Sequence, residues 1–251
     1  MKKKIAKSVV SLAIATFACG AFAGDNPNDP AEGFNRAMFA VNEGLDTVIA
    51  KPVAKAYDYA VPLPVKAVTG NFFSNIADLM IGVNNLLQGK PMDALSDWGR
   101  VAVNTTIGIG GAFDVASEMG LDKHYEDFGQ TLGVWGVPSG AYLFWPIIGP
   151  RNVRDTAGWV VDTNVEPVWY IQDIPWRNSL VAVRYVDQRA NLLPTDKIIE
   201  EGALDKYSYI RDAYIQHRVS AIHDGNVPRS SASPAAPLGP TSSQPERPAG
   251  K

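Results

Sequence analysis

The chain has 251 residues, of which 46% are apolar and 20% are charged, and its formal net charge is −3. This is the composition of an ordinary globular protein with enough chain for a sizeable core. Because the chain is not strongly basic, its composition argues against a nucleic-acid-binding protein. Its one cysteine, Cys19, excludes an internal disulfide.

The first 23 residues have the three parts of an export signal. Four lysines come before residue 8, an apolar stretch runs from Ser8 to Ala18, and Ala21-Phe22-Ala23 supplies small residues for cleavage. Residues 1–23 are therefore predicted to be a signal peptide. Loss of these four of the 23 basic residues leaves 19 against 26 acidic ones. The mature chain is predicted to be an acidic protein of a bacterial periplasm or envelope.

Cys19, at the end of the apolar stretch, has two interpretations. Cleavage directly before it, with residues 1–18 as the signal, would create an N-terminal cysteine for lipid attachment. Cleavage after Ala23 would remove it. Thr16 and Phe17 do not fit the Leu and the small residue expected in a lipid-attachment box, which favours removal.

The folded part is predicted to begin with an amphipathic helix. Asp29 is the expected N-cap, followed by Pro30 at the first helical position and by Glu32 as its capping-box partner. The residue before Pro52 is expected to end this helix. One helical face carries the apolar side chains Phe34, Met38, Val41, Leu45 and Val48.

Further helices are predicted down to residue 222, and convincing strand alternation is scarce. The expected fold is therefore all-α and occupies residues 29–224, while the Pro- and Ser-rich residues 225–251 are expected to be a disordered tail. The predicted helices run from Val65 to Leu87, from Pro91 onward, from Asn152 to Asp162, from Ser179 to Leu192 and from Asp205 to Ile222.

Two uncharged segments interrupt the helical pattern, residues 101–113 and residues 128–150. In the second segment, Pro138 and Pro146 exclude one continuous spanning helix, which leaves a helix–break–helix or a hairpin that dips into one membrane leaflet. Its aromatic residues suit either an ordinary core or an interfacial belt. In the first, Gly108 to Gly111 suit either a tight turn or a bend at membrane depth.

No catalytic constellation is visible. Ser139 lacks the glycine two residues before it that a nucleophile elbow needs, and the three histidines, His124, His217 and His223, lack metal-ligand spacing. The chain is predicted not to be an enzyme and to use no metal or cofactor.

Seven motifs give the sequence a resemblance to a known family. In order, over about Asp29 to Ile222, the chain resembles the MlaA family, also called VacJ. The motifs are DPAEGFNRAMFAVN, KPVAKAYDYAVP, NFFSNI, NNLLQGKP, RVAVNTTIGIGGAFDVA, EDFGQTLGVWGV and RDTAGWVVD.

The resemblance implies a fold, a place and a function. The fold is a ring of amphipathic helices embedded in the inner leaflet of the outer membrane, with a central channel and a short hairpin loop. The function is to remove mislocalised phospholipid from the outer leaflet and pass it to a periplasmic carrier, MlaC, which maintains lipid asymmetry. The partners are phospholipids, MlaC and a trimeric outer-membrane porin.

The resemblance also implies roles for three groups of residues. A hairpin loop bordering the channel corresponds to Phe128, Gly129, Gly133, Gly136, Pro138 and Gly140, where Pro138 stands in place of a hinge glycine. Control of channel leakage by the first helix corresponds to Phe34, Asn35, Phe39 and Asn42. The side facing the membrane and the porin corresponds to Tyr142, Phe144 and Trp145.

A second function, from a different class, is a structural adaptor that docks on porins without conducting lipid. The uncharged segments would then be a protein-binding patch. Lipid conduction itself needs no covalent chemistry, because a polar path through the ring lowers the cost of moving a headgroup across hydrocarbon.

Overall fold

The computed structural model describes residues 26–228, so the predicted signal peptide, Cys19 and most of the predicted tail lie outside the described residues. The helices are α2 (Glu32–Leu45), η1 (Asp46–Ala50), α3 (Lys51–Ala60), α4 (Leu63–Leu87), α5 (Pro91–Thr106), α6 (Val115–Glu118), α7 (Phe128–Val134), α8 (Val153–Val165), η2 (Pro167–Tyr170), α9 (Ile174–Asn191), α10 (Leu193–Gly202) and α11 (Lys206–Ile222), and the strands are β1 (Tyr142–Trp145) and β2 (Gly149–Asn152).

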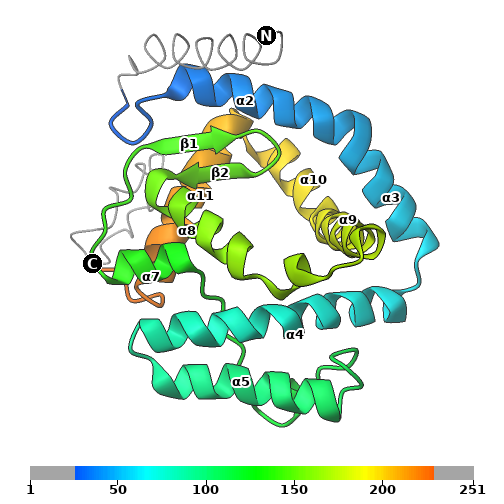
Figure 1. The fold of residues 1–251 in the computed structure, drawn as a ribbon. Coiled ribbons are helices and arrows are strands. Elements are labelled where there is room, and N and C mark those ends of the chain that lie inside the picture. The colour runs from blue at the N-terminus through cyan, green and yellow to red at the C-terminus, as the bar shows by residue number, and fades with distance from the viewer. Residues whose placement is uncertain (1–25, 229–251) are drawn as a thin grey trace, which may run out of the picture.

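The helices form a ring (Figure 1). The α2 to α3 rod and α4 make up two sides, α5 lies along the outside of α4, and α7, α8 and α11 gather on a third side. Helix α9 packs against both α3 and α4. Within residues 26–228, no helix has both the length and the apolarity that crossing a bilayer requires. The predicted all-α ring is confirmed, with one antiparallel hairpin, β1–β2, added.

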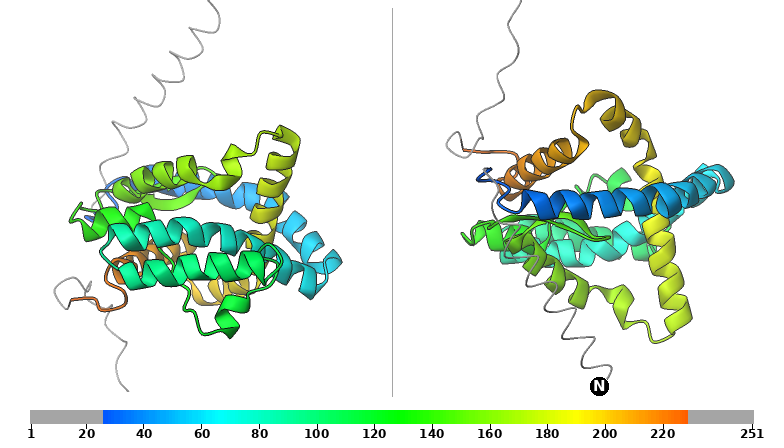
Figure 2. Two further views of the ribbon diagram at one scale, coloured as in Figure 1. Left: turned by 60° about the horizontal axis from the view of Figure 1, so that its bottom comes forward. Right: turned by 90° about the horizontal axis from the view of Figure 1, so that it is seen from above.

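The first helix does not stop before Pro52, contrary to the prediction. Instead, α2 passes through the π-helical turn η1 directly into α3, and the three elements form one long rod (Figure 2). Pro52 falls in the first turn of α3. A π turn shifts the backbone hydrogen-bond pattern by one residue, so a new α-helical pattern begins at α3. Because the first N–H groups of such a pattern need no helical partner, the N–H that Pro52 lacks is not missed.

Asp29 is not the N-cap either. The cap position is Ala31, with no side-chain hydrogen bond, and Asp29 is fully buried. Its carboxylate accepts hydrogen bonds from Asn35 and from Tyr207, and Arg211 lies within ion-pair distance of it. The start of the rod is thereby tied to α11, which closes the ring between the two ends of the described chain.

The apolar core lies at this closure. Tyr142 and Phe144 are 2% and 4% exposed, and they pack with Tyr207 against Phe39. The prediction that Tyr142 and Phe144 face the membrane or a porin is therefore wrong. Alternate side chains of a strand point to opposite faces, and this pair points inward. Trp145 is half-buried and donates its indole N–H to Thr156.

The glycine-rich turn after α5 is tight rather than a broken helix. Ile109, Gly110 and Gly111 all have positive φ, at 54°, 69° and 87°. A Cβ on Gly111 would lie 2.8 Å from the Asn75 side chain, so the turn packs closely on α4. The side chain of Ile109 is exposed. These contacts support the first of the two sequence interpretations, a tight turn.

A buried arginine holds α4, α5 and the following loop together. Arg100 is 1% exposed, and its guanidinium contacts the carboxylates of Asp78 and Asp114. It also donates to the carbonyl of Leu121 at 2.7 Å. The fully buried guanidinium is compensated by the two carboxylates. Its removal leaves Asp78 with Lys123 as its remaining cation and, within residues 26–228, leaves Asp114 without an ion-pair partner.

We expect Arg100→Ala to lower the free energy of unfolding by about 3–5 kcal/mol, because Asp78 and Asp114 lose their shared partner. Denaturant unfolding of the detergent-purified protein, followed by circular dichroism, measures this loss. The matched control is Lys197→Ala at an exposed position on α10, where the change should stay within about 1 kcal/mol. An equal loss in both variants would contradict the central role of Arg100.

Candidate functional site

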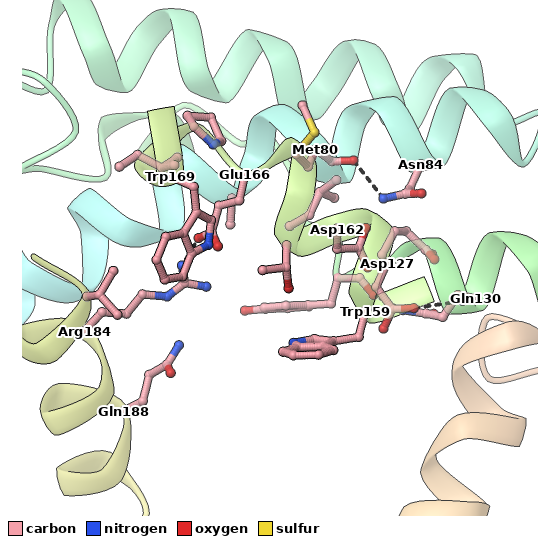
Figure 3. Close-up of a pocket in the computed structure, with 18 of the residues that line it drawn as sticks. Met80, Asn84, Asp127, Gln130, Trp159, Asp162, Glu166, Trp169, Arg184 and Gln188 are labelled. Atoms are coloured by element: carbon pink, nitrogen blue, oxygen red, sulfur yellow. Dashed lines mark hydrogen bonds and ion pairs between the residues drawn. The ribbon is translucent and has the colours of Figure 1, made fainter. Parts of the chain in front are cut away.

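A cavity of about 460 Å³ lies inside the ring, with walls from α4, α7, α8, α9 and α11. Its lining combines indole rings with charged side chains, and each of two facing walls carries both kinds of side chain. Figure 3 shows Asp127, Gln130, Trp159 and Asp162 on one side of the open space and Glu166, Trp169, Arg184 and Gln188 on the other. The cavity is therefore amphipathic, with apolar contributions from Met80 and Ile81 of α4.

One wall is held by an arginine between two carboxylates. Arg218 of α11 donates to both oxygens of Asp127, at 2.5 and 2.9 Å, and to Asp155 of α8 at 2.8 Å. Asp127 is also the N-cap of α7, since it accepts from the amide of Gln130. Burial alone would raise the pKa of Asp155, but hydrogen bonds from Arg218 and Tyr214 outweigh it and lower that pKa. This network fixes α7, α8 and α11 relative to one another.

The facing wall carries a second ion pair. Glu166, just after α8, contacts the guanidinium of Arg184 on α9. Trp169 of η2 lines the same wall, and the Arg177 guanidinium lies 5.7 Å from its ring centre. The cation of this wall is thus already neutralised by a carboxylate.

Asp162 differs from the other acidic residues of the cavity. Both its carboxylate oxygens accept from the amide of Phe128, at 3.1 and 3.3 Å, yet within residues 26–228 it has no ion-pair partner. Glu126, Asp127 and Glu166 are each paired with a cation. Burial raises the pKa of Asp162 to about 6. The cavity thus contains one desolvated, uncompensated carboxylate.

The segment from Phe128 to Gly140, predicted to be a hairpin loop, is a helix in its first half, α7. This part of the prediction is wrong because Asp127 caps a helix that begins at Phe128, and glycines let that helix pack closely on α8 and α11. A Cβ on Gly158 would lie 2.4 Å from the backbone N of Gly129, and a Cβ on Gly133 would meet Ile222 at 2.8 Å. Gly129 and Gly133 therefore serve close packing.

The second half of the segment connects α7 to the hairpin. Gly136 has φ +87° and follows the last turn of α7, where a left-handed residue closes a helix. Trp135 anchors this turn by donating its indole N–H to the carbonyl of Leu87 at 3.0 Å. Gly140 has φ +68°, and Pro138 lies between the two glycines. Whether this connection moves as a hinge stays a prediction.

Two asparagines of the first helix hold the free edge of β1. Asn35 donates to the carbonyl of Tyr142 at 3.0 Å and accepts from the amide of Phe144 at 2.8 Å. Asn42 donates to the carbonyl of Trp145 at 2.9 Å and accepts from the amide of Ile147 at 2.7 Å. The two side chains thus replace a neighbouring strand.

Three of the four first-helix candidates are therefore brought together at the hairpin. Asn35 and Asn42 bind the hairpin, Phe39 packs edge-to-face on Phe144 at 5.4 Å, and Phe34 lies half-buried near the start of α2. Control of leakage stays a prediction, but these contacts link the first helix to the hairpin.

Sequence reasoning missed the charged and indole residues of α8 and α9. In the sequence, the motif RDTAGWVVD contributes to the resemblance but assigns no role to Trp159 or Asp162. The signal available was a charge within an otherwise apolar helix face, where Trp159 and Asp162 are three residues apart. Arg184 gave no such signal, because α9 has charged residues along much of its length.

The outside of the ring exposes many large apolar side chains. On α2, η1 and α3 these are Val41, Leu45, Val48, Ile49 and Val53, and on α4 and α5 they include Leu63, Val65, Leu86, Met92 and Leu95. Contiguous exposed apolar surface marks a site of contact with a membrane or another protein. Within the described residues, no cluster of three or more His, Cys, Asp or Glu side chains is arranged to hold a metal ion.

The fold and the cavity define an all-helical ring with an amphipathic interior and an apolar rim. The MlaA lipoprotein family model matches residues 27–221, and the chain belongs to this family.

Relatives and a solved structure agree with this. The chain is 33% identical over 211 residues to the "Intermembrane phospholipid transport system lipoprotein MlaA" of Haemophilus influenzae, covering 82% of this chain and 84% of the relative. It is 33% identical over 204 residues, 80% of each chain, to the protein of the same name in Escherichia coli. An uncharacterized protein of Rickettsia typhi, RT0044, is 36% identical over 196 residues, 77% of this chain and 78% of that protein. A chain solved for the "structural basis for maintenance of bacterial outer membrane lipid asymmetry" superposes with a TM-score of 0.68 at 34% identity, covering 77% of this chain and 98% of that one.

We expect Asn42→Ala to loosen the tip of the hairpin without unfolding the protein. Loss of a hydrogen bond worth about 0.5–1.5 kcal/mol should speed amide exchange at Ile147 by roughly 2- to 10-fold. Hydrogen–deuterium exchange with mass spectrometry on the peptide containing residues 142–150 measures this.

Asn35→Ala provides the contrast, because it leaves the buried edge groups of Tyr142 and Phe144 without their partner and removes one of the three partners of Asp29. We expect it to reduce global stability by about 1–3 kcal/mol. Asn178→Ala, at an exposed position on α9, should change neither quantity. Unchanged exchange in Asn42→Ala would show that its side chain does not hold the hairpin.

The raised pKa of Asp162 predicts a pH dependence of stability. The folded-state pKa of Asp162 is about 6, above the ordinary aspartate value of 3.8, so the folded state binds the proton more tightly than the unfolded state. The resulting stabilisation is complete below pH 3.8 and is lost as pH rises through 6. We therefore expect Asp162→Asn to melt above the wild type at pH 7.5, with a difference that shrinks toward pH 5. A difference independent of pH between 5 and 7.5 would contradict this.

Proposed function

We propose that the chain is the outer-membrane component of a retrograde phospholipid transport system. It removes mislocalised phospholipid from the outer leaflet and passes it to a periplasmic carrier, and so maintains lipid asymmetry. The observation that carries the proposal is the amphipathic cavity enclosed by a helical ring with an apolar rim. The names of the relatives in Haemophilus influenzae and Escherichia coli support it.

The geometry suits this task in two ways. The exposed apolar side chains of α2 to α5 favour insertion of the ring in one leaflet, because burial of apolar surface stabilises by about 25 cal/mol per Å². The charged walls then give a headgroup polar partners inside the ring. Transfer of a charged or polar headgroup through hydrocarbon without such partners costs several kcal/mol or more.

The direction of net transport comes from outside this chain. A cavity that binds and releases lipid without chemistry conducts both ways, so the affinity of the receiving carrier sets the net flow. We propose a carrier of the MlaC type as that partner, and a trimeric porin as the partner that holds the ring in the outer membrane. Attachment through a lipid at Cys19 would add a second anchor.

We expect Ala77→Phe, which fills the cavity from α4, to behave like deletion of the gene. Surface phosphatidylethanolamine, labelled with a membrane-impermeant amine reagent, should rise in both strains and return to normal with the wild-type copy. Ala157→Phe, on α8 but exposed and outside the cavity, is the matched control and should complement fully.

Co-purification with porins separates transport from the adaptor function. A transport defect predicts that Ala77→Phe still co-purifies with porins while surface labelling rises. Normal labelling in both the deletion strain and Ala77→Phe would overturn the transport proposal and favour the adaptor.

A further inference from the structure

The preference of the cavity for particular headgroups is open, and two charges near Trp159 bear on it. Asp162, on the same helix as Trp159 and three residues later, is the uncompensated carboxylate described above. It lies on the cavity wall, so a ligand in the cavity can reach its carboxylate. In a partly desolvated site, a carboxylate without a counter-charge is stabilised by any cation that enters.

Arg151 is the matching cation. It is half-buried at the end of β2, and within residues 26–228 it makes no ion pair, while its Nε is buried without a hydrogen-bond partner. Its guanidinium lies 5.4 Å from the ring centre of Trp159, a cavity-lining residue. Burial lowers the pKa of Arg151, and the charges of Asp127 and Asp155, which are already paired with Arg218, offset this only in part.

The two charges influence each other without touching. The positive charge of Arg151 acts to lower the pKa of Asp162, so the groups are within electrostatic range, yet they form no ion pair. The other charges around them are already paired, namely Glu126 with Lys90, Asp127 and Asp155 with Arg218, and Glu166 with Arg184. Within residues 26–228, the two groups left without an ion-pair partner are Arg151, beside the Trp159 ring, and Asp162, which lines the cavity with Trp159.

We propose that Arg151, Trp159 and Asp162 form a subsite for a zwitterionic phosphoethanolamine headgroup. Arg151 binds the phosphate and Asp162 binds the primary ammonium, whose charge also lies against the indole face. A guanidinium matches phosphate with two parallel hydrogen bonds, and a carboxylate accepts from an ammonium N–H. The proposal rests on the proposed function, because Trp159 and Asp162 line the cavity that the function uses and Arg151 borders that cavity through the Trp159 ring.

The subsite favours ethanolamine over other common headgroups. A glycerol headgroup would satisfy Arg151 through its phosphate but leave Asp162 without a cation. A choline headgroup brings a cation that has no N–H to donate. Gln130 lines the same cavity, is 4% exposed, and its Oε1 accepts no hydrogen bond within the described residues. The cavity thus offers an unused acceptor on Gln130 in addition to the carboxylate of Asp162.

The test uses the full protein purified from membranes in detergent, with short-chain lipids as probes. Isothermal titration calorimetry measures binding of dihexanoyl phosphatidylethanolamine and of dihexanoyl phosphatidylglycerol. We expect the wild type to prefer phosphatidylethanolamine by about tenfold. Asp162→Asn should bring this ratio close to one, because asparagine keeps an acceptor for the Phe128 amide but removes the charge.

Three further variants separate selectivity from a structural effect. Asp162→Glu keeps the charge and should keep the preference. Arg151→Gln should weaken both lipids by a similar factor, since both carry phosphate. Asp122→Asn, at an exposed position outside the cavity, should change neither affinity. If Asp162→Asn does not fold, unchanged affinity of Arg151→Gln for both lipids would still overturn the subsite.

Two further outcomes would overturn the subsite. A wild type that binds both lipids equally would refute it while leaving the proposed function intact, and so would a preference that survives in Asp162→Asn. Failure of the wild type to bind either lipid would instead count against the proposed function itself, and the subsite would fall with it.

Discussion

Closure of the ring depends on one buried carboxylate. Asp29 joins the beginning of the first rod to α11 through Asn35, Tyr207 and Arg211. A buried charge is stable only when such partners surround it, so the two ends of the folded chain must meet for Asp29 to be satisfied. The aromatic core of Tyr142, Phe144 and Tyr207 then forms at the junction, and the cavity lies within the closed ring.

The distribution of polarity follows from this ring. Fully buried positions are more often polar than apolar, with Asp78, Asp97, Arg100 and Asp155 among them, while large apolar side chains lie outside. Such an arrangement would be unfavourable in water, where exposed apolar surface is hydrated. It is favourable for a ring whose rim contacts lipid and whose interior holds polar groups. The same feature explains why ion pairs, rather than an extensive apolar core, fix α4, α5, α8 and α11.

Much of the helical pattern could be predicted from the sequence, and the exceptions have physical causes. The helix that begins at Pro91 and the helix that ends at Ile222 were predicted from the spacing of apolar residues and from neighbouring Gly or Pro residues, which are local signals. The prediction for Pro52 was wrong because the preceding π turn places this proline in the first turn of α3, where its missing N–H costs no hydrogen bond. The prediction for Asp29 was wrong because its carboxylate accepts a hydrogen bond from the distant Tyr207 instead of capping the helix. Of the site, the resemblance pointed to Asn35 and Asn42, but not to their shared task of binding the edge of β1.

The sequence alone determined that residues 128–150 carry no charge and that two prolines forbid a single spanning helix there. It also determined the helical class, because apolar residues that recur about every 3.6 positions are a pattern of near neighbours in the sequence. Only the tertiary structure decided which side chains of that segment are buried in the protein. Tyr142 and Phe144 became core because α2 and α11 close over them. Asp162 became an uncompensated charge because, within the described residues, no cation forms an ion pair with it. Burial and charge pairing are properties of neighbours far apart in the sequence, and so no local pattern could specify them.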